Sequence, residues 1–510
     1  MSTGDKSGAD TTLIRGADCV IAWDASANQH AYLSGGDVVF AGGALTFVGR
    51  GYRGAARTVI DAAGLMVMPG LVNIHSHPST EPMYRGLNEE LGSPGLYNSS
   101  LYEFMPIFRA DPAAKPACTR VAYSEMLLSG VTTVADLSMP HEGWIDIAAK
   151  SGLRVCLAPM FRSAEWRTRN GHVVEYDWNE KAGERAMGEA LSLIDQARAH
   201  PCGRLSGMVV PAQIDTCSEG LLRESFAEAV RRDLPWQTHA AQSVVEAHEI
   251  TRRHGKTPIG WLDHLRTLSD RSIIGHAIFI DDHPATRWST DSDLGRLADS
   301  GTMVAHCPTV FARRGIALKD MGRYLRRGVG IGIGTDTYPH NMLSELRLAA
   351  YVARLQGASP RALRTTDIFN AATIAGARAL RRDDIGRLQA GCRADLVLID
   401  LTHPAMRPAH DPIRTLIYAA DDRAVRAVYV DGHKVVADGK VLTIDYPAAA
   451  ASLAQAQRRI VERAPSLDWA GRTLDQLVPP TLSQMQSLET PPARLRGDAK
   501  RRKARRNKGK

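Results

Sequence analysis

The stretch VMPGLVNIHSHP, residues 67–78, decides how the rest of the chain is interpreted. It is an apolar segment that passes through Pro69-Gly70 and ends in a histidine pair, His75 and His77. Side chains two residues apart in a β-strand point to the same face, so both imidazoles can reach one metal ion. The pattern predicts a strand whose carboxyl end carries half of a metal site.

Further strand-like segments end at polar residues or prolines through the middle of the chain. The predicted strand ends are His75, Asp136, Pro159, Pro211, His239, His276, His306 and Asp336. From Pro211 onward they recur roughly every 30 residues, the length of one strand-helix unit of a parallel sheet. Eight such units favour an α/β fold of the TIM-like (β/α)8 barrel type. An open doubly wound sheet is the alternative, and it explains less well why polar residues end so many strands.

Strand-rich segments flank this middle part on both sides. We expect residues 11–68 and 385–445 to form one composite β-sandwich domain, with Asp431-Gly432 as the turn of a hairpin. The remaining predicted parts are a disordered N-terminus (1–10), the metal-dependent barrel (69–384), a C-terminal helical extension (446–493) and a basic disordered tail (494–510).

The positive charge of the chain is concentrated in that tail. The chain has 510 residues and a formal net charge of +8. Residues 494–510 hold ten Lys or Arg and one Asp, so the tail carries the excess charge and the rest is close to neutral. A solvated end is the simplest interpretation, and a tether for RNA or another polyanion is the alternative. The sequence contains no recognisable RNA-binding motif, so we do not expect nucleic acid to be a main partner.

Cysteine usage and hydropathy point to the cytoplasm. Seven cysteines are scattered without a C-x-x-C pair, which argues against a disulfide scaffold or a thiolate zinc site. No apolar run reaches the roughly 18 residues of a membrane span, and no apolar signal segment opens the chain. We therefore expect a cytoplasmic protein that acts on a small molecule and not at a membrane.

Three more candidate site residues stand at predicted strand ends. His239 lies in LPWQTHAAQ, His276 in RSIIGHA and Asp336 in VGIGIGTDTYPHN. Three of these four histidines together with Asp336 form a nitrogen and oxygen donor set that suits Zn²⁺, and also Fe²⁺, Co²⁺ or Mn²⁺. Each residue alone is more often structural, but their shared position at successive strand ends favours a metal centre.

Taken together, these motifs resemble the amidohydrolase superfamily. The resemblance rests on PGLVNIHSH, SGVTTVADLS, the His239 and His276 strands, GIGTDTYPHN and AGCRADLVLIDL, and spans about residues 11–441. The chain looks most similar to the branch of cytosine and guanine deaminases and triazine (chlorohydrolase-like) hydrolases. The resemblance implies metal ligation by His75, His77, His239 and Asp336, with His276 beside the metal. It also implies a homo-oligomer.

The chain departs from the family pattern at strand 4 and strand 5. Members with two metals carry a carboxylated lysine on strand 4, but RLSGMVVPAQIDTCS contains none, so we expect one divalent ion per chain, Zn²⁺ before the others. Family deaminases carry His-x-x-Glu on strand 5, where this chain has His239-Ala240-Ala241-Gln242. Glutamine can hydrogen-bond but cannot take up a proton, which puts ordinary ring deamination in question. Glu246, one helical turn further on, is a possible substitute.

We therefore expect an enzyme that hydrolyses carbon–nitrogen bonds other than peptide bonds. A metal-activated water would cleave an amide, urea, carbamate or amino-heterocycle. Asp336 would pass the proton from that water to the leaving group, and His276 would stabilise the developing oxyanion. The alternatives are a deaminase or dechlorinase of a pyrimidine, purine or s-triazine ring, and an inactive barrel that serves as a scaffold.

Residues around the expected centre are candidates for contacting the substrate or holding the ligands. They are Gln242, His306, Tyr338, His340 and Asn341, with Gln237 as a further neighbour of His239. An aromatic wall from Trp144, Phe161 and Trp166 is possible, with ordinary packing as the alternative. The long segment from Pro78 to Ser100 is a candidate lid or specificity loop.

Overall fold

The computed structural model describes residues 11–87, 91–483 and 485. Two four-stranded parallel sheets form its centre, in the orders β12-β8-β7-β6 and β14-β15-β16-β17. Their strands are β6 (Leu71–Ser76), β7 (Val131–Asp136), β8 (Arg154–Leu157), β12 (Leu205–Gly207), β14 (Trp236–Ala240), β15 (Ser272–His276), β16 (Met303–His306) and β17 (Gly330–Ile333). Short β9 (Met160–Phe161) and β13 (Val210–Pro211) pair in parallel beyond β8 and β12.

Isolated parallel bridges join the two sheets at both edges. Ser76 pairs with Asp336, and this links the ends of β6 and β17. Val209 pairs with Trp236 and Gln213 with His239, and these link the fourth strand to β14. The eight strands therefore follow one another around a ring, as in a TIM barrel, and their carboxyl ends meet at one rim.

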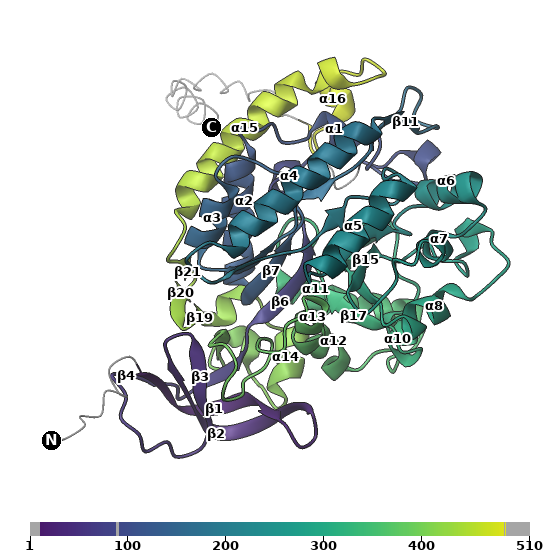
Figure 1. Cartoon of the computed structure of the whole chain (residues 1–510). Helices are drawn as coiled ribbons and strands as arrows, with labels where there is room; N and C mark the ends of the chain where they lie inside the picture. The colour runs from purple at the N-terminus through teal and green to yellow at the C-terminus, as the bar shows by residue number, and fades with distance from the viewer. Residues whose placement is uncertain (1–10, 88–90, 484, 486–510) are drawn as a thin grey trace, which may run out of the picture.

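Helices surround this ring (Figure 1). α5, for example, buries Leu221, Leu222 and Ala229, exposes charged residues on its other face, and begins at a Ser218 side chain that accepts from the Leu221 amide. The helices between barrel strands and after β17 are α2 (Lys115–Leu128), α3 (Trp144–Ser151), α4 (Glu180–Arg198), α5 (Glu219–Arg231), α6 (Val244–His254), α7 (Pro258–His264), α8 (Asp293–Asp299), α9 (Pro308–Ala312), α10 (Met321–Arg326), α11 (Met342–Gln356), α12 (Thr365–Ala371) and α13 (Ile374–Ala379).

Strands from both ends of the chain form one further sheet of nine strands beside the barrel (Figure 1). The strands are β1 (Thr11–Asp24), β2 (Gln29–Ala41), β3 (Ala44–Gly49), β4 (Thr58–Asp61), β5 (Leu65–Pro69), β18 (Leu396–Asp400), β19 (Val425–Val430), β20 (His433–Ala437) and β21 (Lys440–Val441). The two flanks meet where β5 pairs antiparallel with β18. The extra domain thus draws on both flanks. Its description as a sandwich stays a prediction, because the strands form one connected sheet.

A buried ion pair ties this sheet to the barrel. Arg154 on β8 donates to Asp395, which precedes β18, from Nε at 2.9 Å and from Nη2 at 3.0 Å. Nη2 also lies 3.1 Å from Oδ1 of Asp431, and the side chains of Arg154 and Asp395 are only 2% and 1% exposed. Burial by itself would lower the pKa of Arg154, but the two carboxylates raise it above its ordinary value. The pair stays charged.

The C-terminal helix α15 (Tyr446–Leu467) starts beside β21 and packs along α2, and α16 (Leu474–Leu477) packs against α15 (Figure 1). Gln457 donates to the carbonyls of Met83 and Arg85 at 2.8 and 2.9 Å. Trp469 Nε1 donates to Glu103 at 3.0 Å. The extension therefore holds the segment that follows β6, which contains the short helices η2 (Glu81–Tyr84), η3 (Pro94–Leu96) and α1 (Phe104–Ile107).

The predicted disordered ends, residues 1–10 and 494–510, lie outside the described residues. Within the described ranges, no helix combines the length and the apolar character needed to cross a bilayer.

Candidate metal centre and substrate cavity

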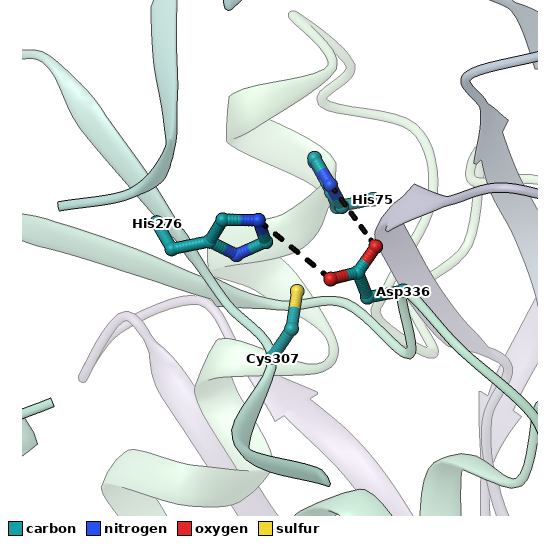
Figure 2. A group of neighbouring side chains, drawn as sticks. All are labelled: His75, His276, Cys307 and Asp336. Carbon is teal, nitrogen blue, oxygen red and sulfur yellow. Dashed lines mark ion pairs between the residues drawn. The ribbon is translucent and has the colours of Figure 1, made fainter. Parts of the chain in front are cut away.

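Five predicted side chains converge at the carboxyl rim of the barrel: His75, His77, His239, His276 and Asp336. Oδ1 of Asp336 lies 3.5 Å from His75 Nε2 and 3.2 Å from His77 Nε2. Its other oxygen lies 3.6 Å from His276 Nε2, on the opposite side of the carboxylate (Figure 2). One carboxylate therefore faces three imidazoles in a buried site.

The tautomers of His77 and His239 follow from their backbone partners. His77 Nδ1 lies 2.6 Å from the carbonyl oxygen of Leu137, and His239 Nδ1 lies 2.5 Å from that of Ala212. A carbonyl oxygen only accepts, so each Nδ1 carries the hydrogen and each Nε2 carries a lone pair. The two Nε2 atoms nevertheless lie 3.2 Å apart. Facing lone pairs repel unless a cation lies between them.

These distances fit a divalent ion. With metal–nitrogen bonds of about 2.0–2.1 Å, two nitrogens on one tetrahedral ion lie roughly 3.3 Å apart. His75 supplies a further free nitrogen. Its Nδ1 donates to Oε1 of Gln237, whose own amide donates to the Ile74 carbonyl at 3.1 Å and so is fixed in orientation. His75 Nε2 is buried and has no hydrogen-bond partner among the described residues. The donor set therefore fits the metal that the sequence predicts.

Two glycines leave room for the His75 side chain. A Cβ atom on Gly275 of β15 would stand 2.8 Å from Cε1 of His75. One on Gly334, just after β17, would stand 2.6 Å from the Cβ of His75. Both distances are below van der Waals contact, so glycine is required wherever the imidazole crosses a neighbouring strand.

Burial keeps the imidazoles of His77, His239 and His276 neutral. It lowers the pKa of His77 to about 4 and that of His276 to about 3, against the opposing effect of Asp336. The pKa of His239 lies well below its ordinary value for the same reason. Burial alone would raise the pKa of Asp336, but the imidazoles of His75, His276 and His77 around it hold it well below its usual range. At neutral pH the site is thus a carboxylate among neutral nitrogens, the state that binds a cation without releasing protons.

Gln242 reaches the cavity above this site, and its amide nitrogen is buried with no partner in the described part of the chain. Its backbone is held from behind. The carboxylate of Glu246, which is fully buried, accepts from the amides of Ala241 at 2.6 Å and Gln242 at 3.1 Å. Glu246 therefore fixes the turn after β14, and it is not among the residues that line the cavity.

The other predicted substrate residues lie behind or beside the ligands, outside the cavity lining. His340 is buried, with Nδ1 3.1 Å from Ser76 Oγ and 3.0 Å from Thr335 Oγ1. Asn341 caps α11 by accepting from the Ser344 amide at 3.1 Å. Tyr338 stacks under the Arg313 guanidinium, 4.4 Å from the ring centroid. His306 is buried at the end of β16, and burial lowers its pKa to about 4.

Cys307 points towards His75, His276 and Asp336 in Figure 2. One potential ligand atom from each of these four residues lies within 4.8 Å of the others. Burial, followed by the charge of Asp336, raises the pKa of the thiol well above its ordinary value. A protonated thiol is a poor metal ligand, so the histidines and Asp336 are the better donors.

A cavity of about 370 Å³ opens above the five residues. Its floor includes His77, His239, His276 and Asp336, and its walls are mainly apolar: Tyr84, Leu96, Tyr97, Leu101, Met105, Met139, Met160, Trp166, Val244, Phe279, Val310, Phe311 and Ile316. Of the three aromatic residues considered for a wall, Trp166 lines the cavity, whereas Trp144 and Phe161 are buried in the core. The segment between Pro78 and Ser100 contributes wall residues, as its length suggested.

Sequence reasoning missed Gln213 and six charged side chains of the cavity. Gln213, which pairs with His239, enters from the fourth strand. Glu81, Arg109, Lys115, Arg162, Glu165 and Arg314 enter from segments that connect strands and helices. Only Glu81 among these residues had a sequence signal: it stands four residues after His77, in the segment predicted as a candidate lid or specificity loop.

Comparison with known proteins agrees with this architecture. The 5'-deoxyadenosine deaminase of Methanosarcina mazei is 27% identical over 433 residues, 84% of this chain and 94% of the relative. The 5-methylthioadenosine/S-adenosylhomocysteine deaminase of Haloarcula marismortui is 29% identical over 409 residues, 79% of this chain and 89% of that protein.

Two solved structures share the fold. An adenosine deaminase from Xanthomonas campestris with bound zinc has a TM-score of 0.74 at 24% identity, covering 88% of this chain and 98% of that one. The zinc complex of atrazine chlorohydrolase from Arthrobacter aurescens has a TM-score of 0.73 at 24% identity, covering 88% and 100%. The sequence profile of the amidohydrolase family matches residues 66–435, from β5 to β20, and the chain belongs to the amidohydrolase family.

Proposed function

We propose that this protein hydrolyses a C–N bond in a small, largely apolar molecule, with one divalent ion held by His75, His77, His239 and Asp336. The observation that carries the proposal is the pair of facing lone pairs on His77 and His239, 3.2 Å apart on the floor of the cavity. Zinc is the first candidate, because the donor set suits it and two structural neighbours contain it.

Different residues of the site have different roles in the proposed reaction. A bound divalent ion would supply Lewis-acid activation of water and of the bond to be cleaved. Asp336 is the carboxylate on the cavity floor, so it accepts the proton of the attacking water and delivers it to the leaving nitrogen. His276, fixed beside Asp336, donates a hydrogen bond to the oxygen on which negative charge develops.

Gln242 bears on the substrate class. It stands where family deaminases carry a glutamate, and its amide can orient a substrate carbonyl or amine without moving a proton. Amide, urea and carbamate cleavage needs one proton on the leaving nitrogen, which Asp336 provides. Deamination of an aromatic ring also needs a proton on the ring nitrogen, which Gln242 does not provide.

Ring deamination or dechlorination is the second candidate function. The names of the relatives favour it, because the two quoted above are deaminases of adenosine derivatives and one structural neighbour is a chlorohydrolase. Under this alternative another group, such as a water ordered in the cavity, carries the ring proton.

A substrate panel separates the two. Zinc-loaded protein would be assayed against anilides, phenylureas and aryl carbamates on one side, and against aminopyrimidines, chlorotriazines and 5'-deoxyadenosine on the other. We expect turnover of the first group and a large gain in ring deamination when Gln242→Glu restores a carboxyl group. If the unmodified protein turned over only the ring substrates, the proposal would be overturned in favour of the second function. An inactive scaffold would bind no metal.

Several coarser expectations stay proposals alongside this one. We propose the domain limits 11–68 with 385–445, 69–384 and 446–493, a sandwich-like sheet domain, a cytoplasmic location and a homo-oligomeric state. Light scattering tests the oligomeric state directly: a mass of at least two times 55.4 kDa is expected. Metal analysis by mass spectrometry should find one ion per chain.

A further inference from the structure

Three cations gather at the solvent-facing end of the cavity. Arg109 follows α1, Lys115 is the first residue of α2, and Arg162 follows β9. All three line the cavity, and we call them the cationic rim. The side chain of Arg109 is 46% exposed, whereas His75, His239 and Asp336 below are buried, so Arg109 marks the mouth of the cavity.

The rim is poorly balanced by acidic groups. Glu165 is the one carboxylate that pairs with it among the described residues, through hydrogen bonds from Arg162 at 2.8 Å and 2.5 Å and a distance of 3.9 Å to Arg109. Its side chain is 59% exposed, so water screens much of its charge. Lys115 donates to the carbonyl of Pro140 at 3.4 Å, and within the described ranges no carboxylate lies within 4.0 Å of its ammonium.

The cations also repel one another. Burial, and after it the charge of Arg109, lowers the pKa of Lys115. Burial likewise lowers the pKa of Arg162, with Glu165 opposing the shift and Arg109 adding to it. Lys115 stands moreover in the first turn of a 14-residue helix that has no acidic residue there, so the helix dipole adds positive potential at the same place. The arrangement costs stability unless an anion joins it.

The inner charged pair of the cavity differs in this respect. Arg314 is half-buried, and its largest attractive partner is Glu81, which is 6% exposed. Both side chains line the same inner wall, and burial, followed by the charge of Asp336, raises the pKa of Glu81 to about 8. Arg314 thus has a buried carboxyl group beside it, whereas Lys115 of the rim has no carboxylate within 4.0 Å among the described residues.

We propose that the cationic rim binds a negatively charged group of the substrate, a carboxylate, sulfonate or phosphonate, at the end remote from the scissile C–N bond. The inference rests on the proposed function for the position of that bond. The substrate is then an amphipathic molecule: an apolar, aryl-sized body that fills the cavity, a C–N bond at the floor and an anion at the mouth. Guanidinium and ammonium groups supply the charge-assisted hydrogen bonds that such a group accepts.

Ligands without a scissile C–N bond test the rim separately from the chemistry. Biphenyl-4-carboxylate, -sulfonate and -phosphonate would be compared with neutral 4-acetylbiphenyl by calorimetry on the zinc-loaded protein. The measured quantity is the ratio of the neutral to the anionic Kd. We expect this ratio to fall about tenfold in Arg162→Gln and in Lys115→Gln, since each loses a charge-assisted contact. It should also fall as salt is raised, because the rim is partly exposed.

Removal of the carboxylate gives the opposite result. Glu165→Gln deletes the acidic group of the rim, so we expect the ratio to rise about threefold. Arg169→Gln is the matched control: this side chain belongs to the same connecting segment, is 66% exposed and does not line the cavity, and its loss should leave the ratio unchanged.

The outcomes decide the proposal. A ratio that stays constant in Arg162→Gln, Lys115→Gln and Glu165→Gln overturns it, and would mean that the anion binds the metal instead of the rim. Lys115→Gln guards against misfolding, because Lys115 makes one long hydrogen bond in the structure. Failure of the proposed function has a different signature: no turnover in the substrate panel, with the Kd ratios and their response to the rim variants intact.

Discussion

Two buried clusters of this protein each bring carboxylate oxygens and side-chain nitrogens together, and they differ in how completely these atoms are paired. At the junction of barrel and sheet, Arg154 makes three hydrogen bonds of 2.9 to 3.1 Å to Asp395 and Asp431. At the rim of the barrel, Asp336 faces three imidazole nitrogens at 3.2 to 3.6 Å, longer than good hydrogen bonds. The first cluster is complete within the protein, whereas the second leaves buried lone pairs unused.

The difference separates a structural cluster from a functional one. A buried charge needs a partner for nearly every donor and acceptor, because an unpaired one costs several kcal/mol, about 3–5 when a partner is removed. Arg154 and Asp395 meet this condition with protein groups alone. The histidine cluster meets it when a cation is added. Incomplete pairing at a buried site thus points to a ligand, and the following changes break or sharpen this contrast in order of expected size.

Removal of one metal-ligand candidate should have the largest effect. His239→Ala leaves too few donors for a tight site, so we expect loss of bound zinc and a fall in kcat/KM of roughly a thousandfold or more. Metal content and kinetics would be measured together. His254→Ala, which removes an imidazole that stacks on Trp261, is the control and should retain both. A His239→Ala protein that still holds one ion would contradict the assignment.

Breaking the complete cluster should instead cost stability and leave metal binding intact. Asp395→Ala strands the buried Arg154 guanidinium, and we expect the free energy of unfolding to drop by about 3–5 kcal/mol. Urea denaturation measures it. The double variant Arg154→Met with Asp395→Leu removes both charges and should recover most of the loss. If the single variant proved neutral, the structural role of the cluster would be wrong.

Crowding the His75 side chain should moderately lower both the zinc affinity and the stability of the protein. Gly275→Ala puts a Cβ atom 2.8 Å from the imidazole, so the ring or the strand must move, at a cost of about 1–3 kcal/mol. Weaker zinc binding should accompany the lower melting temperature. Gly188→Ala on α4 has open space around it and should stabilise the protein by about 0.5–1 kcal/mol, which provides the contrast.

Loss of the group behind His75 should weaken metal binding alone. Gln237→Leu removes the acceptor of the His75 Nδ1 hydrogen, and we expect zinc affinity to fall about 10–100-fold with little change in the fold. Gln237→Glu keeps an acceptor and should bind zinc at least as tightly as the unmodified protein. Competition with a chelator gives both values, and equal affinity in all three proteins would rule out this role.

The smallest expected effect is that of mild acid on zinc affinity. The folded pKa values of about 4 for His77 and about 3 for His276 lie below the ordinary 6.5, so neither imidazole takes up a proton between pH 7 and 5.5. Imidazoles with the ordinary pKa of 6.5 would bind zinc less tightly as the pH falls over this range, since protons compete with the metal. The sign for stability follows: below pH 6.5 the unfolded chain binds protons that the folded chain does not, so the metal-free protein loses stability as the pH falls towards 4. Zinc titrations at three pH values, with denaturation of the metal-free protein alongside, check both statements.

Much of this architecture could be predicted from local sequence. His75, His77, His239, His276 and Asp336 follow apolar strands, and a parallel barrel brings all strand ends to one rim, so their proximity needs no long-range information. The glycines that leave room for His75, Gly275 on β15 and Gly334 after β17, lie at the ends of the same strands.

The cavity walls could not be predicted in this way. Glu81, Arg109 and Lys115 stand in a connecting segment whose course depends on contacts with the distant helix α15, such as those of Gln457 with Met83 and Arg85. No period or spacing encodes such a contact. For Tyr338, His340 and Asn341, sequence placed the residues near the site but not the direction of their side chains, which the turn after β17 sets; His306 is buried at the end of β16.

The grip of Glu246 on the turn after β14 has a consequence for how this site changes over time. Because Glu246 holds the backbone amides of Ala241 and Gln242, the position of residue 242 is independent of the side chain it carries. A proton-carrying side chain and a neutral one can therefore be exchanged there by a single substitution, without refolding of the loop. Under the proposed function, one substitution at residue 242 changes the reaction while the metal ligands and the cavity walls stay in place, so related enzymes can differ in chemistry without an intermediate that fails to fold.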